Sequence, residues 1–208
     1  MLKLGIMVSG GGTNLQAIID KIQSGYLDKC TIVTVVSSKP DVYALERAKK
    51  YGIPTACILR KSFEDIGEYD RAFVSHFSKY AVDLVVLAGF LSLLGEGFVE
   101  KYRNRIINIH PALIPSFCGK GYYGITPHRK ALEYGVKVTG ATAHFVEPEY
   151  DSGPIILQKS VNIHDDDTPE SLQLRVMQQA EWDILPEAIK LFSEGRLVIE
   201  GRKVRIIE

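Results

Sequence analysis

Short apolar runs rich in Val and Ile alternate with segments of helical spacing through the first half of this chain. The apolar runs cover residues 4–9, 31–37, 56–59 and 84–88, and the helical segments cover residues 14–24, 42–51 and 69–80. In the first helical segment, Leu15, Ile18 and Ile22 recur at intervals of three and four residues, which gives one apolar face. Such alternation predicts parallel strands connected by crossover helices. We therefore expect an α/β fold, with a Rossmann-like, mostly parallel twisted sheet and helices on both faces.

The second half of the sequence predicts an antiparallel extension at the C-terminal side of this sheet. Residues 105–109 have the pattern of a fifth strand, and residues 139–146 and 155–161 have that of a further strand pair. A small hairpin is expected at 197–206. Because the chain has neither repeats nor a linker, residues 1–208 are expected to form a single domain.

One long helix is predicted between these strands and the hairpin. Thr168 can cap a helix and Pro169 suits a first turn, so the helix is expected to begin there. It is expected to run to about Phe192, with a kink at Pro186.

Composition and charge limit the partners and the compartment. Lys and Arg together number 25, as do Asp and Glu, so the formal net charge is zero and no basic field favours nucleic acid. The three cysteines form no Cys-x-x-Cys pair, which argues against disulfides and against a thiolate zinc site. No apolar run approaches the roughly 20 residues of a membrane-spanning helix. We expect a cytoplasmic protein that acts on small molecules, without metal, nucleic acid or membrane, as a monomer or homodimer.

A glycine-rich turn, Ser9-Gly10-Gly11-Gly12-Thr13-Asn14, connects the first predicted strand to the first predicted helix. Glycine lets the backbone approach an anion, and the free N–H groups of a helix N-terminus favour phosphate. The turn is not a dinucleotide fingerprint, because Leu15 stands where that motif has its last glycine, and no Gly-Lys-Ser/Thr follows as in a P-loop. Phosphate binding is the favoured interpretation, and a tight turn without a ligand is the alternative.

Three polar residues suit acyl-group chemistry that uses neither a metal nor a protein nucleophile. Asn108 and His110 lie two residues apart at the end of the fifth predicted strand, so their side chains are expected on the same side. Ligands of open α/β sheets bind at such strand ends. An amide and an imidazole can stabilise the negative charge that a carbonyl oxygen acquires on attack. Asp151, in the turn before Gly153-Pro154, is the best carboxylate to pair with the imidazole.

Each of these residues also has a structural interpretation. A histidine before proline is often structural, Asn108 could cap a turn, and Asp151 could be a turn residue. His144 lies in an apolar strand and is expected to serve packing or a hydrogen bond, whereas His128 could begin a helix near the site. The chain has no His-x-x-His spacing of a zinc site and no Gly-x-Ser-x-Gly elbow of a serine hydrolase.

The motifs and their order resemble a known family. The chain carries Gly-Gly-Gly-Thr-Asn-Leu-Gln-Ala-Ile at 10–18, Ala-Gly-Phe at 88–90, Asn-Ile-His-Pro at 108–111 and Asp-Ser-Gly-Pro at 151–154. Together they resemble the phosphoribosylglycinamide formyltransferase family, folate-dependent enzymes of purine biosynthesis, over nearly the whole chain. The Asn-x-His-Pro and Asp pattern belongs to formyl-folate transferases and hydrolases in general, and the glycine turn narrows the resemblance.

The resemblance implies a reaction and a role for each catalytic candidate. The amine of glycinamide ribonucleotide would attack the formyl carbon of 10-formyltetrahydrofolate, a co-substrate, to give formylglycinamide ribonucleotide and tetrahydrofolate. His110 would polarise the formyl oxygen and take part in proton transfer, and Asn108 would bind the same oxyanion. Asp151 would hold the imidazole. Neither a metal nor a covalent intermediate is implied.

The same resemblance assigns the binding residues. The ribonucleotide phosphate would be surrounded by Gly12, Thr13, Asn14, Leu15 and Gln16. The pocket of the reduced folate would be lined by Leu91, Ser92, Leu93, Leu94, Asn108 and Glu147. Glu181 would hold the amino end of the substrate, and a solvated helix face is the alternative for it.

This sequence departs from the family pattern at three places. Ser92 and Ile66 stand where many members carry basic residues, so folate contacts at these positions would rest on the backbone. The loop from Ser116 to Gly124 is longer than usual and contains three glycines. We expect this loop to be a lid, in which Lys120 or the tyrosines replace the missing positive charge.

Three other functions compete with this interpretation. Formyltetrahydrofolate hydrolase shares the catalytic trio, but it usually carries a domain before the catalytic one and needs no phosphate site. Methionyl-tRNA formyltransferase would need an added basic domain. A non-catalytic nucleotide-binding module would leave the Asn–His–Asp combination unexplained. We therefore predict the transferase and keep the hydrolase and the binding module as alternatives.

Overall fold

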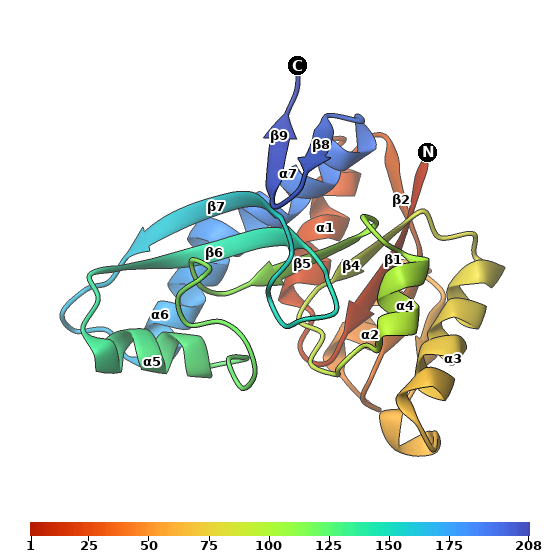
Figure 1. Cartoon of the computed structure of the whole chain (residues 1–208), viewed down its shortest axis with the longest axis horizontal. Coiled ribbons are helices and arrows are strands. Elements are labelled where there is room, and N and C mark those ends of the chain that lie inside the picture. Colours follow the sequence, from red (N-terminus) through yellow and green to blue (C-terminus); the bar gives the residue numbers. More distant parts are fainter. The chain divides into compact units, whose positions relative to one another are not determined.

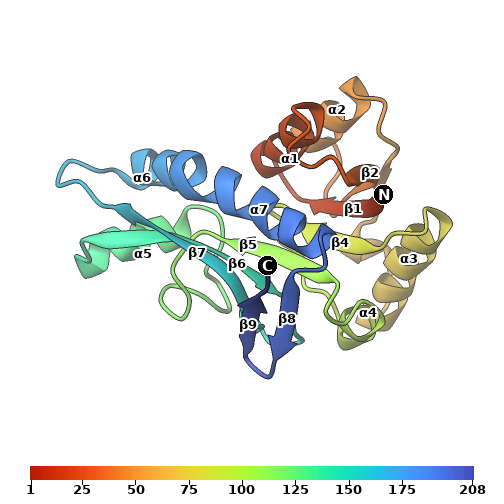
Figure 2. The same ribbon diagram turned by 90° about the horizontal axis from the view of Figure 1, so that it is seen from above.

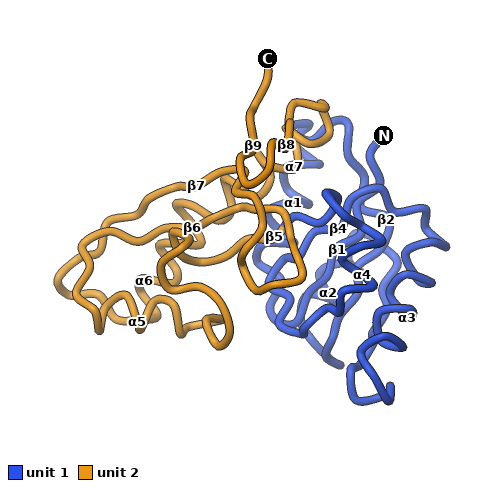
Figure 3. Tube along the Cα trace, in the orientation of Figure 1, with its two compact units in different colours: residues 1–107 blue, residues 108–208 orange.

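The computed structural model describes residues 1–208 and consists of two units, Met1–Ile107 and Asn108–Glu208 (Figure 3). Unit 1 alternates strands and helices in the predicted order. Its elements are β1 (Leu2–Val8), α1 (Thr13–Gln23), β2 (Cys30–Ser37), α2 (Tyr43–Lys50), β3 (Thr55–Cys57), a 3-10 turn (Arg60–Ser62), α3 (Ile66–Lys79), β4 (Leu84–Leu87) and α4 (Glu96–Lys101) (Figure 1).

The sheet of unit 1 is parallel and is covered on both faces. Its strand order is β3-β2-β1-β4, and each neighbouring pair is parallel. Helices α1 and α2 lie on one side of β1, and α3 and α4 lie on the other (Figure 2). Consecutive residues such as Ile6 and Met7 of β1, or Val35 and Val36 of β2, are fully buried, as a doubly covered sheet requires. The predicted α/β class is confirmed.

Helix α4 was not predicted from the sequence, and its contacts with α3 explain why it forms. The carboxylate of Asp70 on α3 accepts hydrogen bonds from the backbone N–H groups of Gly95 (2.9 Å) and Phe98 (3.1 Å), which start α4. Phe98 packs edge-on against Phe73 of α3, with ring centroids 5.9 Å apart. A six-residue helix is too short to be stable alone, so these tertiary contacts determine it.

Unit 2 contains the predicted antiparallel strands. It begins within β5 (Ile106–His110), whose first two residues belong to unit 1. Its other elements are α5 (Thr126–Tyr134), β6 (Val138–Phe145), β7 (Ile155–Asn162), α6 (Pro169–Val176), a π-helical turn η2 (Met177–Glu181), α7 (Trp182–Ser193), β8 (Leu197–Glu200) and β9 (Lys203–Ile206). The strand order is β5-β6-β7-β9-β8. Strands β6 and β7 are antiparallel, and β8 and β9 form the predicted antiparallel hairpin around Gly201.

The long helix begins as predicted but is interrupted at a different place. Thr168 accepts a hydrogen bond from the backbone N–H of Ser171, and Ser171 reciprocates, which makes a capping box. The chain then stays helical to Ser193, with Pro186 inside α7. The irregular turn is η2, ahead of Pro186, where a π turn accommodates an extra residue. None of the helices combines the length and apolar composition needed to cross a lipid bilayer.

Candidate functional site

The glycine turn of unit 1 lies where three parallel strands end. Ser9 follows β1, and its hydroxyl oxygen lies 2.6 Å from that of Ser38, which follows β2. The same Ser9 oxygen accepts the backbone N–H of Leu91, 2.9 Å away, in the segment after β4. The predicted phosphate turn and the start of the predicted folate segment are therefore joined at the carboxyl edge of the sheet, where open α/β sheets bind ligands.

Gly12 is the residue in this turn that must be glycine. It precedes α1 with a φ angle of 75°, in the left-handed region. A Cβ there would lie 2.6 Å from the Cβ of Ala44 on α2, so the turn also needs the space. No side chain caps the N-terminus of α1, and its first turn carries no acidic residue. These features suit an anion at the helix N-terminus.

The other residues predicted to bind phosphate differ in what they can offer. Leu15 is fully buried and Asn14 is 7% exposed. The side chain of Leu15 belongs to the core of unit 1, so only its backbone N–H is suited to an anion. Thr13 and Gln16 are half-buried at the start of α1.

The segment predicted to contact folate presents apolar side chains at the surface of unit 1. Leu91 is 44% exposed and Leu93 is 49% exposed, whereas Leu94 is buried and Ser92 is half-buried. Two neighbouring exposed leucines are suited to an apolar ring.

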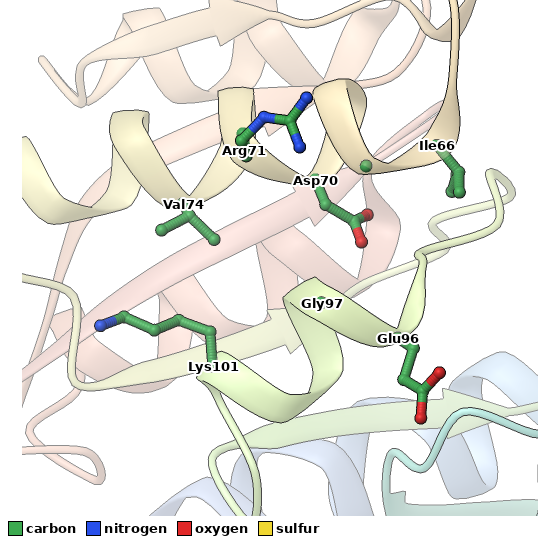
Figure 4. A pocket seen from close by; sticks show the side chains of 8 residues that line it. Ile66, Asp70, Arg71, Val74, Glu96, Gly97 and Lys101 are labelled. Carbon is green, nitrogen blue, oxygen red and sulfur yellow. The ribbon is translucent and has the colours of Figure 1, made fainter.

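A groove of about 420 Å³ lies between α3 and α4, lined by Ile66, Gly67, Asp70, Arg71, Val74, Glu96, Gly97 and Lys101 (Figure 4). The carboxylate of Asp70 is already bound to the start of α4. None of the predicted site residues lines this groove. Ile66, at one of the positions where the family pattern has a basic residue, contributes an apolar wall to it.

Four polar side chains meet in unit 2. His110, at the end of β5, has its Nδ1 3.6 Å from Oδ2 of Asp151. The other carboxylate oxygen of Asp151 lies 3.8 Å from Nε2 of His144 on β6. The amide nitrogen of Asn108 lies 3.1 Å from the same Nε2. His110 is 4% exposed and His144 is 1% exposed, so the predicted trio converges with a second histidine in a nearly dry environment.

The hydrogen bonds of His144 determine its tautomer and the orientation of Asn108. Its Nδ1 lies 2.7 Å from the carbonyl oxygen of Phe145, which can only accept, so Nδ1 carries the proton. Nε2 is therefore an acceptor, and the Asn108 amide donates to it. Burial lowers the pKa of His144, which keeps the ring neutral near pH 7. One N–H of the Asn108 amide remains for a ligand.

The long loop after β5 holds both members of the histidine–carboxylate pair. Nε2 of His110 donates to the carbonyl oxygen of Phe117, 2.9 Å away, so Nδ1 is the ring nitrogen that faces Asp151. The backbone N–H of Gly119 donates to Oδ2 of Asp151 at 2.8 Å. The loop's Gly119, Gly121 and Gly124 all have φ angles in the left-handed region, from 60° to 91°.

The turn that carries Asp151 is pressed against the end of β6. A Cβ at Gly153 would overlap the carbonyl oxygen of Phe145, so this position has room only for glycine. The backbone N–H of Phe145 donates to the carbonyl of Pro154 at 2.9 Å. The same short stretch of β6 thus positions both His144 and the carboxylate.

The two glutamates of the binding-site prediction have different environments. Glu147 is exposed after β6. Glu181 ends the π turn η2 and is 6% exposed, so the alternative of a solvated helix face is wrong. No group of three histidine, cysteine or acidic side chains is arranged to hold a metal ion.

His128 in α5 is fully buried, and neither ring nitrogen has a hydrogen-bond partner. Burial, and secondarily the nearby His110, lowers the pKa of His128 from 6.5 to about 4. His128 therefore binds a proton more weakly in the folded protein than in the unfolded chain. Its contribution to the free energy of unfolding is fully present above pH 6.5 and is lost as the pH drops toward 4. At pH 5 the loss is expected to be about 2 kcal/mol relative to pH 7.

Replacing this histidine tests that expectation. The His128→Leu variant lacks this titrating group, so its free energy of unfolding should not show this loss. Between pH 7 and pH 5 the variant is therefore expected to become about 2 kcal/mol more stable relative to the parent. Urea denaturation of both proteins at the two pH values measures the difference, and the other titrating groups cancel in the comparison. Parallel stability changes in parent and variant would contradict the prediction.

Comparisons with known proteins cover nearly the whole chain, across both units. A family model described as Formyl transferase matches residues 2–189. The chain belongs to this family. As a formyl transferase it is 42% identical over 197 residues to the phosphoribosylglycinamide formyltransferase of Haemophilus influenzae, covering 95% of this chain and 90% of that protein. The crystal structure of glycinamide ribonucleotide transformylase 1 from Symbiobacterium toebii matches with a TM-score of 0.94 and 43% identity, over 100% of this chain and 95% of that one.

A deformylase of the same fold is less similar to this chain in sequence. The structure of a formyltetrahydrofolate deformylase from Pseudomonas syringae has a TM-score of 0.88 and 25% identity, and the chain covers 66% of it. The fold is therefore shared with a hydrolase, whereas the sequence is nearer to the transferases.

Proposed function

We propose that the chain transfers the formyl group of 10-formyltetrahydrofolate to the amine of glycinamide ribonucleotide, giving formylglycinamide ribonucleotide and tetrahydrofolate in purine biosynthesis. The observation that carries the proposal is the convergence of Asn108, His110 and Asp151 in a buried cluster. Family membership and the names of the relatives support it. The proposed setting is the cytoplasm, with residues 1–208 acting as one formyltransferase domain, as a monomer or homodimer.

In the proposed mechanism the formyl carbon gains a bond to the substrate amine and loses its bond to the folate nitrogen. The substrate amine attacks the formyl carbon, a C–N bond forms, and the formyl oxygen becomes an oxyanion. The free N–H of Asn108 stabilises that charge, and the positive charge that His110 gains when it takes up the proton of the amine adds to this. The bond from the formyl carbon to the folate nitrogen then breaks, and a proton lost by the amine reaches that nitrogen.

The position of Asp151 suits the proton transfer in this mechanism. Because Nε2 of His110 donates to Phe117, the nitrogen that can take up a proton is Nδ1, which faces the Asp151 carboxylate at 3.6 Å. A carboxylate so close stabilises the imidazolium that forms when the proton arrives. The groups act by proximity and charge, without a covalent intermediate.

The binding roles belong to the same proposal. Gly12, Thr13, Asn14, Leu15 and Gln16 hold the phosphate, chiefly through backbone N–H groups at the start of α1. The reduced folate contacts Leu91, Ser92, Leu93, Leu94, Asn108 and Glu147. Glu181 holds the amino end of the substrate. Its burial supports a fixed position for this carboxylate.

The decisive experiment measures formyl transfer with and without glycinamide ribonucleotide, following tetrahydrofolate and the formylated nucleotide together. Folate release that depends on the nucleotide, with an equal amount of formylated product, is the expected result. Equal release of folate and formate without the nucleotide would identify a hydrolase instead. Binding of the nucleotide with no turnover would favour the non-catalytic module.

The role of His144 gives a further prediction. Because its Nε2 accepts from Asn108, the His144→Leu variant loses the partner that orients the amide. We expect kcat to fall about tenfold, since the oxyanion donor is then misdirected rather than removed. His144→Gln, which offers an amide oxygen near the position of Nε2, is expected to recover most of the rate.

A double-mutant cycle separates this positioning role from general packing. In the Asn108→Ala background, His144→Leu should lower kcat by less than about twofold, because the group it orients is gone. Steady-state kinetics of the four proteins give the coupling. The same tenfold loss in both backgrounds would mean that His144 does not act through Asn108.

A further inference from the structure

Arg47 on α2 is bound to the glycine turn of unit 1. Its Nε donates to the carbonyl oxygen of Gly11 at 2.9 Å, and its Nη1 donates to the side-chain oxygen of Gln16 at 3.1 Å. One guanidinium thus connects the turn before α1 to the first turn of α1. Helices α1 and α2 lie side by side on the same face of the sheet (Figure 2).

Neighbouring groups hold this guanidinium in place. It stacks on the ring of Tyr43, with its central carbon 4.7 Å from the ring centroid. The amide nitrogen of Gln16 donates to the hydroxyl of Tyr51 (3.0 Å) and to Asp20 (2.8 Å), which fixes the amide so that its oxygen faces Arg47. Both ends of the interaction are therefore set before any ligand arrives.

Helix α2 donates hydrogen bonds to two consecutive carbonyl groups of the turn. The backbone N–H of Ala44 donates to the carbonyl of Gly10 at 3.1 Å, and the side chain of Arg47 donates to the carbonyl of Gly11. In a trans peptide the N–H points opposite to the C=O of the same unit. The N–H groups of Gly11 and Gly12 therefore point away from α2, toward the side where an anion would bind. The carbonyl groups of Gly10 and Gly11 point toward α2 and so do not repel that anion.

We propose that Arg47 is a positioning residue of the phosphate site: it orients the Gly11–Gly12 peptide and fixes Gln16, so that the turn presents N–H groups to a phosphate. This inference rests on the proposed function, since it concerns the phosphate of that substrate. Arg47 acts through the turn, and contact between its own side chain and the phosphate is not required. The planar guanidinium of Arg47 donates two hydrogen bonds in different directions, one to Gly11 and one to Gln16, and a lysine ammonium cannot reproduce this geometry.

The test compares Arg47→Met and Arg47→Lys with a matched control, Lys50→Met. Lys50 lies on the same helix, also over the ring of Tyr43 at 5.4 Å, and is exposed, so its replacement removes the same charge without touching the turn. Steady-state kinetics give kcat and the KM of each substrate, and inorganic phosphate serves as a competitive inhibitor whose Ki reports the site directly.

Arg47→Met is expected to raise the nucleotide KM and the phosphate Ki about tenfold or more, with the folate KM unchanged and kcat at saturation within about twofold. Arg47→Lys should recover only a small part of this loss, and Lys50→Met should match the parent. Full recovery with lysine would overturn the inference, because charge alone would then be sufficient. Equal effects of Arg47→Met and Lys50→Met would also overturn it.

Melting curves of the variants and formyl transfer by the parent protein keep these outcomes distinct. If Arg47→Met fails to fold, as melting curves would show, Arg47→Lys against Lys50→Met still decides between orientation and charge. If the parent shows no nucleotide-dependent formyl transfer, the proposed function fails. If the parent is active and the Arg47 variants match Lys50→Met, only the inference about Arg47 fails.

Discussion

Replacing His110 by Gln is expected to lower kcat for formyl transfer about a thousandfold, with smaller changes in the KM of either substrate. Glutamine can still donate to the carbonyl of Phe117 through an amide N–H, so the loop contact made by Nε2 is preserved. It has no titratable group at the position of Nδ1, where the histidine faces Asp151. The variant therefore removes proton transfer and the cationic form of the ring, while the neighbouring loop keeps its partner.

The measurement is kcat at saturating nucleotide and folate, with melting temperature as the check on folding. His164→Gln is the matched control, because it makes the same chemical change at an exposed histidine of the same unit. It is expected to behave as the parent. A loss of less than about tenfold in His110→Gln would mean that the imidazole is not the group that carries the reaction, and that the cluster serves mainly to bind the folate.

The parallel half of the fold could be predicted from the sequence because its strands are buried on both faces. Unbroken apolar runs separated by amphipathic helices allow few other arrangements. Helix α4 escaped prediction because its causes are not local. Its first N–H groups are satisfied by Asp70, which precedes Gly95 by 25 residues. The position of the π turn η2 in the last long helix likewise has no signal as strong as Pro186, which is accommodated inside α7.

The candidate site was predictable where the chemistry depends on side chains with unusual functional groups. His110 is one of only five histidines in this chain, and the structure brings it together with Asn108 and Asp151. His144 was expected to serve packing or a hydrogen bond, and it makes its bond to Asn108, 36 residues away. Alternation along β6 would have placed it on one face, but the partner strand was needed to show what that face meets.

Two kinds of participant had no sequence signal at all. The carbonyl of Phe117 and the N–H of Gly119 are backbone groups that every loop possesses, so only the path of the loop reveals that they hold His110 and Asp151. Arg47 looks like any basic residue on a solvated helix, and only the packing of α2 against α1 shows that it binds the glycine turn.

Replacing Asp151 by Asn is expected to lower kcat about a hundredfold, with little change in the nucleotide KM. The amide has nearly the size of the carboxylate and can accept the N–H of Gly119, which donates to Oδ2 in the parent, so the loop should keep its position. What is lost is the negative charge 3.6 Å from Nδ1 of His110, which stabilises the imidazolium during the reaction. Glu149→Gln is the matched control, because it neutralises an exposed carboxylate in the same turn.

The double variant shows whether Asp151 acts through His110. If the carboxylate serves only to stabilise the charged imidazole, Asp151→Asn should add less than about threefold to the loss in the His110→Gln background. Multiplied losses would mean that Asp151 acts independently of the ring, for example on the attacking amine. The geometry favours the first outcome, because Asp151 lies between two histidines and its Oδ2 already accepts from Gly119. Its charge is therefore directed at the rings rather than at open solvent.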